Sequence, residues 1–223
     1  MQIVKAGYEI LTPISEGGIE ELKMIEKIGR VCYKSEGRIT EDGESAKKFV
    51  KMLISNGHEA MIEHAPCLSV KFTVDRGVSH ELVRHRLASF AQESTRYCNY
   101  SLEKFGKNCN FIDLGPGLNL DKVCYSENQE TAIMDEWRAA MEDAERHYLK
   151  MIELGASAQI ARSVLPSATK TEITITANYR EWRNFFKLRL PVTAHPQMRE
   201  VTIPLFQELK EILPIIFDDI EFV

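Results

Sequence analysis

Apolar residues recur at every third or fourth position along several stretches of the chain, the spacing that places them on one face of an α-helix. The longest stretch begins at Ser126, which forms a capping-box sequence with Gln129, and ends at Gly155. Asn56 and Gly57 follow another stretch as a C-terminal cap, because both tolerate positive φ. The pattern predicts helices over residues 19–33, 44–55, 77–84, 126–155, 157–163, 178–188 and 196–212.

Two further stretches alternate between apolar and polar residues, which is the period of a half-buried β-strand. Residues 67–74 alternate valine, leucine and phenylalanine with serine, lysine and threonine, and residues 172–177 alternate isoleucine with threonine. Residues 98–125 carry breakers such as Gly115-Pro116-Gly117, so we expect them to be irregular. Helices and strands both occur without a repeated βαβ period, which predicts an α+β (mixed α/β) fold. A length of 223 residues fits one domain covering residues 1–223.

Composition narrows the class of partner. The 28 basic and 33 acidic residues give a net charge of −5, which argues against general binding to nucleic acid backbones. No apolar run approaches the ~20 residues that span a membrane, and the first residues lack the anatomy of a signal peptide. The five cysteines are scattered without a C-x-x-C pair, so we expect reduced thiols and no metal site. These features predict a cytoplasmic protein that binds neither membrane nor nucleic acid.

The segment from Arg84 to Tyr97, RHRLASFAQESTRY, is the most concentrated chemistry in the chain. It holds three arginines, a histidine, two serines and a threonine within fourteen residues of an acidic protein. Guanidinium groups bind phosphate as rigid bidentate forks. The segment therefore predicts an anion site for a nucleotide or a phosphorylated cofactor.

The segment from Asn56 to His64, NGHEAMIEH, invites comparison with zinc motifs. The H-E-x-x-H motif of metalloproteases would need histidine at Ile62, and the inverted H-x-x-E-H motif would need it at Ala60. His58 and His64 are six residues apart, about 240° around a helix at ~100° per residue, so they do not share a face. We therefore do not expect a catalytic zinc ion here.

Polar residues also gather after the second predicted strand. Asn178, Arg180 or Glu181, and Asn184 fall along one edge of the predicted helix, and Arg189 follows near its end. An exposed helix arginine is usually only solvated, and we expect this of Arg183. Upstream, Arg162 stands in the sequence IARSVLP.

Taken together, these motifs resemble the pattern of flavin-dependent thymidylate synthases. The shared elements are R-H-R followed after seven residues by serine, then G-H-E-x-x-x-E-H, A-R-x-x-L-P, N-x-R-x-x-x-N and L-R, and they cover residues 25–200. The chain departs from the pattern at Ala60, where threonine is frequent, at Ala91, where asparagine or serine is frequent, and at Gln92, where glutamate is frequent. The amide of Gln92 keeps an acceptor and adds a donor. His195-Pro196-Gln197 is similar to a family H-x-Q element at altered spacing, and we assign it no role.

The resemblance implies methylation of deoxyuridine monophosphate (dUMP) at C5 to give thymidylate. Methylenetetrahydrofolate would supply the carbon, and flavin adenine dinucleotide (FAD) would carry reducing equivalents from NADPH. It also implies a central antiparallel sheet flanked by helices, and a homotetramer whose active sites are shared between subunits.

Position by position, the resemblance also assigns residues to ligands. Flavin contacts fall to Ala60, Arg84, His85, Arg86, Gln92, Asn178, Tyr179, Arg180 and Asn184. The residues that would contact the substrate nucleotide are Glu81, Leu82, Val83, Arg84, Gln92, Glu93, Ser94, Thr95, Arg96, Arg162 and Arg189. His58 falls in the vicinity of the folate or nicotinamide.

Arg189 is the predicted catalytic residue. Uracil C5 is a poor nucleophile until negative charge can build on the ring, and a fixed guanidinium stabilises that charge as it forms. This would activate the substrate without a covalent enzyme nucleophile. Ser94 and Cys98 are alternative nucleophiles, but a serine needs a base within hydrogen-bond reach, and the sequence shows no orienting triad.

Two other functions fit parts of the pattern. A non-catalytic module could stack single-stranded nucleic acid on Phe90, Tyr97 and Tyr100, with a steep salt dependence. A flavoprotein of the same fold could act on a different nucleotide.

Overall fold

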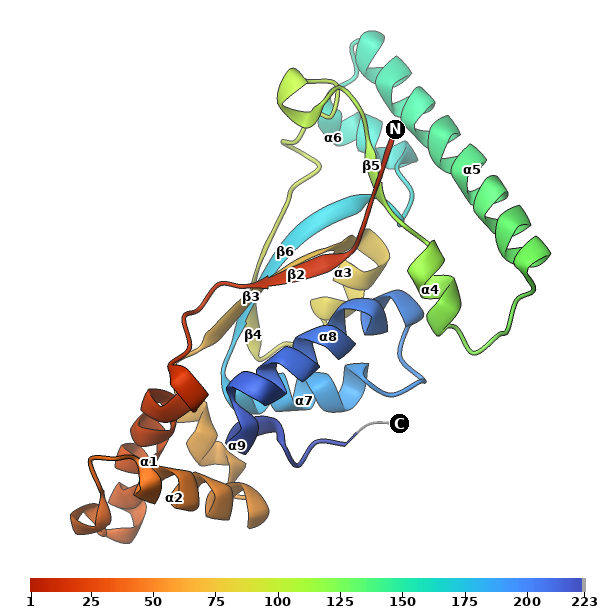
Figure 1. Cartoon of the computed structure of the whole chain (residues 1–223). Helices are drawn as coiled ribbons and strands as arrows, with labels where there is room; N and C mark the ends of the chain where they lie inside the picture. Colours follow the sequence, from red (N-terminus) through yellow and green to blue (C-terminus); the bar gives the residue numbers. More distant parts are fainter. Residues whose placement is uncertain (222–223) are drawn as a thin grey trace.

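The computed structural model describes residues 1–221, and an antiparallel sheet of four strands lies near its middle (Figure 1). The strand order is β2-β3-β6-β4. Along β3 and β6 the apolar side chains lie on a buried face and the polar residues between them lie on the opposite, more exposed face, as the sequence period requires. The strands are β2 (Gly7–Ile10), β3 (Leu68–Asp75), β4 (Ala88–Gln92) and β6 (Lys170–Ala177).

Two helices, α7 (Tyr179–Arg189) and α8 (Pro196–Ile212), pack with the sheet in the main core. The side chains of Phe72 and Trp182 are fully buried there, and the Trp182 indole N–H donates to the Leu68 carbonyl at 3.0 Å. This bond satisfies the one polar group that the indole brings into the core. Because β6 passes into α7 through Asn178 alone, the start of α7 is fixed by the end of the central strand.

Helical segments gather at one end of the sheet (Figure 1). Helix α9 connects these segments to α8. Leu22, Phe49 and Leu53 extend the main core into them. The segments are η1 (Glu16–Gly18), α1 (Ile19–Tyr33), η2 (Glu36–Arg38), α2 (Glu44–Ser55), η3 (Glu59–His64) and α9 (Pro214–Phe217).

The opposite end holds a separate small core around Tyr148 and Phe111 (Figure 1). Strands β1 (Gln2–Val4) and β5 (Asn110–Ile112) pair in parallel beside it. Helix α5 (Glu127–Glu153) is the longest, and Ser126 and Gln129 form the full capping box at its start. The other elements of this region are η4 (Glu103–Phe105), α6 (Ala158–Ala161) and η5 (Arg162–Val164). Helix α3 (Arg76–Leu82) directs Val78 and Leu82 into the main core, and α4 (Gly115–Leu120) packs against α8.

The structure confirms a mixed α/β domain and the predicted helices, with α1 and α2 beginning and ending where the pattern placed them. The expectation that residues 98–125 are irregular is wrong in part, since they contain β5 and α4. Pro116 sits in the first turn of α4, where a missing N–H costs nothing. The pattern also missed β1, β2 and β4, which have three to five residues each and are too short to establish a period.

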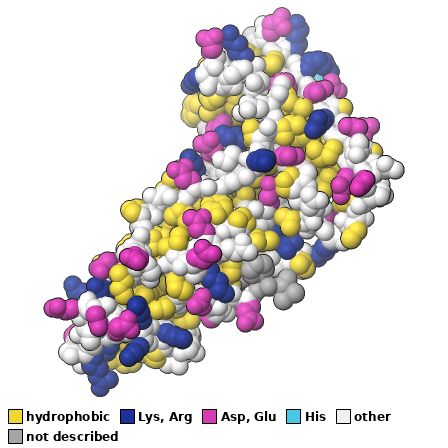
Figure 2. Space-filling model, viewed as in Figure 1, with side chains coloured by type: hydrophobic (Ala, Val, Ile, Leu, Met, Phe, Trp, Pro, Cys, Tyr) yellow, Lys and Arg dark blue, Asp and Glu magenta, His cyan; other side chains and the backbone are white. Residues whose placement is uncertain are grey.

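In residues 1–221, no helix has the length and apolar character needed to cross a bilayer. Acidic and basic side chains are interspersed on the face of the molecule shown in Figure 2. The same described residues hold no group of three or more His, Cys, Asp or Glu side chains placed to bind a metal ion.

Candidate active site

Arg189, at the end of α7, reaches across to α3. Its Nη1 donates to Glu81 Oε2 at 2.7 Å, and its Nη2 donates to the Glu81 carbonyl at 3.1 Å. Asp75 fixes the start of α3 by accepting from the Val78 N–H at 2.6 Å, which is an N-cap interaction. The guanidinium is therefore held by an element that is itself anchored to the central strand β3.

His85 holds the same guanidinium from the turn after α3. Arg189 Nε donates to His85 Nε2 at 3.1 Å, and His85 Nδ1 lies 3.0 Å from Glu181 Oε1. Because an arginine nitrogen can only donate, Nε2 must accept, and the ring proton therefore sits on Nδ1 and is donated to Glu181. The imidazole is thus in one neutral tautomer with both nitrogens used.

Burial and charge both favour that neutral form. His85 is only 5% exposed. Burial lowers the pKa of His85 below its usual value, the Arg189 charge lowers it further, and Glu181 opposes them. Phe185 packs edge-on against the ring with centroids 5.0 Å apart. His85 is therefore a rigid, uncharged acceptor at neutral pH.

A cleft of about 500 Å³ opens beside this network. Asn178 caps α7 by accepting from the Glu181 N–H at 2.9 Å, and Asn184 donates to the Glu181 carboxylate at 3.3 Å. Arg180 Nη1 pairs with Glu63 Oε1 at 2.5 Å across the cleft. The lining residues are Glu59, Glu63, Leu87, Asn178, Arg180, Glu181, Asn184 and Lys187.

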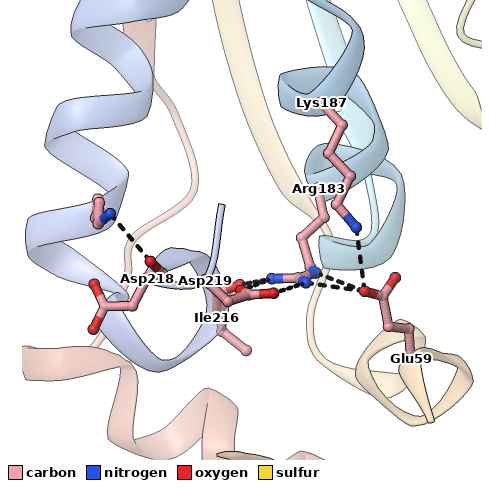
Figure 3. Close-up of polar contacts among 7 residues, drawn as sticks. Glu59, Arg183, Lys187, Ile216, Asp218 and Asp219 are labelled. Carbon is pink, nitrogen blue, oxygen red and sulfur yellow. Dashed lines mark hydrogen bonds and ion pairs between the residues drawn. The ribbon is translucent and has the colours of Figure 1, made fainter. Parts of the chain in front are cut away.

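Arg183 anchors one wall of this cleft, and Figure 3 shows it between Glu59 and Asp219. Its guanidinium donates to Glu59 at 2.9 Å, to both Asp219 oxygens at 2.6 and 2.7 Å, and to the Ile216 carbonyl. The expectation that Arg183 is a solvated surface arginine is wrong, because it is 1% exposed. Two carboxylates from distant segments supply the partners that burial of a guanidinium requires.

A second, cationic pocket of about 410 Å³ lies at the start of α3. Arg162 Nη1 donates to the buried Thr95 hydroxyl at 3.2 Å. Arg76 contributes a buried Nη1 that has no hydrogen-bond partner in residues 1–221. The pocket is lined by Arg76, Thr95, Gln159, Arg162, Ser163 and Leu165.

Comparison with known proteins identifies the family to which this chain belongs. The family described as "Thymidylate synthase complementing protein" matches residues 19–215. The chain belongs to this family, the flavin-dependent thymidylate synthases. It is 32% identical over 219 residues to the flavin-dependent thymidylate synthase of Mycobacterium sp. (strain KMS), covering 93% of this chain and 82% of that protein. It is 31% identical over 194 residues to the enzyme of Geobacter sulfurreducens (strain ATCC 51573 / DSM 12127 / PCA), covering 85% and 78%.

A solved structure shares the fold. It is a UMP/dUMP methylase, PolB, from Streptomyces cacaoi bound with 5-Br UMP, with a TM-score of 0.77 and 20% sequence identity. The match covers 97% of this chain and 94% of that one. Membership of the flavin-dependent thymidylate synthases makes this protein a methyltransferase, and FAD is the cofactor that the family implies.

The structure divides the predicted site residues between two cavities and the exposed surface. Asn178, Arg180 and Asn184 line the cleft, and Thr95 and Arg162 line the cationic pocket. Arg84, Arg86 and Arg96 are exposed. Ala60 and His58 are also exposed, and the Tyr33 hydroxyl lies 3.3 Å from His58 Nδ1.

Other predicted residues point elsewhere. The side chains of Leu82 and Tyr179 are in the main core, so a ligand could reach only their backbone. Val83 is partly exposed and its side chain is apolar. Gln92 donates to the hydroxyls of Ser79 and Thr171 at 2.9 and 3.2 Å.

Glu93 faces a further cavity, where it accepts from Tyr100 at 3.0 Å and pairs with Lys170 at 3.2 Å. These positions follow from strand alternation, since successive residues of β4 and its extension point to opposite faces.

Some residues that line the cavities are not singled out by any sequence motif. Glu59 and Glu63 were within the G-H-E-x-x-x-E-H motif, which marked the segment without singling out its carboxylates. Arg76 had no motif of its own. Its position directly after the strand ending at Asp75 was the available signal, because side chains at strand ends often line sites.

Proposed function

We propose that this protein makes thymidylate by reductive methylation of dUMP, using methylenetetrahydrofolate as the carbon donor and NADPH as the reductant through FAD. One observation carries the proposal: the Arg189 guanidinium is held by Glu81 and His85 and remains 18% exposed. A group that is fixed in place yet reachable suits stabilisation of charge in a transition state.

Arg189 would act on the pyrimidine ring. It cannot lose its proton near neutral pH, so it serves as a permanent positive donor. As C5 attacks the one-carbon unit, negative charge that builds at the uracil ring is stabilised by the guanidinium. The proton then leaves C5, and the electron pair of the broken C–H bond returns to the ring.

The residues around the cleft fit FAD. Its volume of about 500 Å³ lies within the range of ~300–1,000 Å³ that is common for ligand sites. Arg180 and the amides of Asn178 and Asn184 would bind the cofactor, and the exposed Arg84 and Arg86 would supply phosphate contacts. When bound, FAD would supply the reducing equivalents for the methyl group.

The cationic pocket fits the phosphate of the nucleotide. Arg162 and Arg76 bring two guanidiniums to one cavity, and Thr95 and Ser163 add hydroxyls. Arg76 lines the same pocket, so its guanidinium would add positive charge beside a bound phosphate. We therefore add Arg76 to the substrate-binding residues, beside Arg162, Thr95, Ser94 and Arg96.

The geometry around Ser94 supports a mechanism without a covalent enzyme nucleophile. The Ser94 hydroxyl accepts from the Arg96 N–H at 3.3 Å. No imidazole or carboxylate in residues 1–221 is hydrogen-bonded to it, and both nitrogens of His85 are used by Glu181 and Arg189. A serine without a base is a poor nucleophile.

We also propose a homotetramer in the cytoplasm. Leu87 and Tyr97 are each 76% exposed beside the arginines of the same segment, as expected where a second subunit would complete the site. All five cysteines are free, which suits a reducing compartment. Light scattering coupled to size exclusion would test the assembly.

The first experiment is reconstitution with FAD, desalting, and titration with dUMP. A retained flavin spectrum that shifts with dUMP, followed by thymidylate formation with folate and NADPH, is the expected result. Uridine monophosphate should be titrated in parallel, because the structural neighbour acts on both nucleotides by its description. A protein that retains no flavin, or turns over only the ribonucleotide, would refute the proposal.

A further inference from the structure

A chain of hydrogen bonds connects the cleft to Arg189. Asn184 donates to Glu181 at 3.3 Å, Glu181 lies 3.0 Å from His85 Nδ1, and Arg189 Nε lies 3.1 Å from His85 Nε2. The first link lies within α7, and the other two join α7 to His85 in the turn that follows α3. The imidazole is the only member of this chain that can either accept from Arg189 or, once protonated, repel it.

We infer that His85 is a positioning residue that acts through Arg189, fixing the guanidinium by accepting its Nε–H while the ring is neutral. This inference rests on the proposed role of Arg189 in activating the substrate. It differs from a flavin contact, because both ring nitrogens of His85 are already occupied by protein groups.

Protonation of His85 would break this arrangement. A proton on Nε2 would replace the acceptor with a donor and place a second positive charge 3.1 Å from Arg189 Nε. The charged groups that face the ring are Glu181 and Arg189 from α7, and Glu81 from α3 reaches the same guanidinium. Burial lowers the pKa of His85, so the neutral ring would persist somewhat below the usual histidine range.

The surroundings keep the ring from reorienting. Phe185 packs edge-on against it, and the carboxylate of Glu181 is steadied by Asn184. Glu181 is itself only 5% exposed. A ring flip would put a protonated nitrogen against Arg189 and leave Glu181 facing an unprotonated one, losing both hydrogen bonds. The geometry therefore selects the Nδ1–H tautomer.

A direct test needs no catalysis. In protein labelled with ¹⁵N-histidine, the His85 resonances, assigned by their loss in His85→Gln, should show the neutral Nδ1–H tautomer down to at least pH 6.5. Arg189→Gln should alter the Nε2 shift. A resonance that shows Nε2–H, or a charged ring at pH 7, would overturn the inference whatever reaction the enzyme performs.

Kinetics then separate positioning from flavin binding. His85→Leu, which lacks an acceptor, should lower kcat at saturating FAD and dUMP at least tenfold. In the wild type, kcat should fall at low pH as His85 is protonated, which gives the pH profile an acid limb. His85→Gln, which offers an uncharged amide oxygen, should recover most of the lost kcat and remove this acid limb. Glu181→Gln should move the acid limb to lower pH, because it removes the carboxylate that opposes the fall in the His85 pKa.

His80→Gln is the matched control, since His80 is exposed on α3 and should leave the acid limb in place. A weaker flavin affinity in His85→Leu with unchanged kcat would overturn the inference and make His85 a flavin contact. Normal turnover in Arg189→Gln would instead overturn the proposed catalytic role of Arg189, while the ¹⁵N result would still decide the hydrogen-bond arrangement.

Discussion

Two arginines on α7 differ in how fully the fold uses their hydrogen-bond donors. A guanidinium has five N–H donors. Those of Arg183 are directed at Glu59, Asp219 and the Ile216 carbonyl, with Nε, Nη1 and Nη2 all engaged. Those of Arg189 make three hydrogen bonds, to His85 and Glu81, which leaves two N–H groups free of these partners.

The partners differ in charge as well as in number. Arg183 lies between two carboxylates at 1% exposure, so its charge is neutralised and closed off from ligands. Arg189 has one carboxylate and a neutral imidazole, and remains reachable. A saturated guanidinium joins segments of the fold, while an unsaturated one keeps donors for a substrate.

The largest expected effect is on stability at Arg183. Arg183→Met removes the buried guanidinium from Asp219 and leaves Glu59 only its longer pair with Lys187 at 3.4 Å. Because the carboxylate of Asp219 is half exposed, the cost should fall at the low end of the range for breaking a buried pair, about 3 kcal/mol. Urea unfolding of both proteins measures it. Arg180→Met is the matched control on the same helix, since its pair with Glu63 is half-exposed and should be worth at most about 1 kcal/mol. Equal losses in the two variants would contradict the distinction.

Arg189→Gln should show the opposite profile. Losing an electrostatic group that acts in the transition state lowers kcat by about 10²–10³. The unfolding free energy should change by only about 1 kcal/mol, because few net hydrogen bonds are lost. Flavin absorbance, single-turnover rates and urea unfolding on the same preparation give the comparison. Normal turnover, or a loss of unfolding free energy as large as that of Arg183→Met, would mean that Arg189 stabilises the fold, as Arg183 does, and does not act in catalysis.

Sequence patterns predicted the helices and the two long strands, since their periods extend over enough residues to be read. The structure places Asn178, Arg180 and Asn184 at the cleft and Arg162 at the cationic pocket, so the predicted site residues are divided between two cavities. Sequence patterns could not distinguish Arg183 from a solvated arginine. Its partner Asp219 lies 36 residues downstream and Glu59 lies 124 upstream, and no local pattern connects them.

Acid titration should separate the two regions along the pH axis. The pKa of Asp219 is lowered by its hydrogen bond to Arg183. Burial raises the pKa of Glu59, but Arg183 and Lys187 together outweigh it, so this pKa is also lowered. A lowered folded-state pKa contributes stability that is present above the ordinary carboxylate range, near pH 4, and is lost as pH falls through the folded value. That part of the stability should therefore persist until pH falls below about 4.

Activity should fail earlier. The pKa of His85 is lowered from the usual histidine value of 6.5, so its protonation, and with it the displacement of Arg189, begins below that pH. Circular dichroism and initial rates over pH 4–8 would show activity falling while the fold is intact. Arg183→Met should flatten the stability loss below pH 4 and leave the activity limb in place. Coincident loss of activity and structure in the wild type would contradict this separation.

The smallest effect concerns the third arginine of α7. Arg180 pairs with Glu63 at 2.5 Å, and both side chains are about half exposed. Since Arg180 lines the cleft, a cofactor phosphate must compete with Glu63 for the guanidinium. Glu63→Gln weakens the competitor and should raise FAD affinity about two- to fivefold, an effect of the size of one exposed ion pair. The unfolding free energy should shift by less than about 0.5 kcal/mol.

Fluorescence titration of the apoprotein with FAD measures this change. Glu153→Gln is the control, because Glu153 forms a similar exposed pair with Lys150 on α5. A tighter FAD complex in Glu63→Gln alone would make Arg180 an intermediate case, with a partner that a ligand can displace. The three arginines would then form a graded series in which exposure of the partner carboxylate decides whether a guanidinium stabilises the fold or binds ligands. Unchanged or weaker affinity would mean that the carboxylate of Glu63 orients Arg180 for the cofactor, and that competition does not set the affinity.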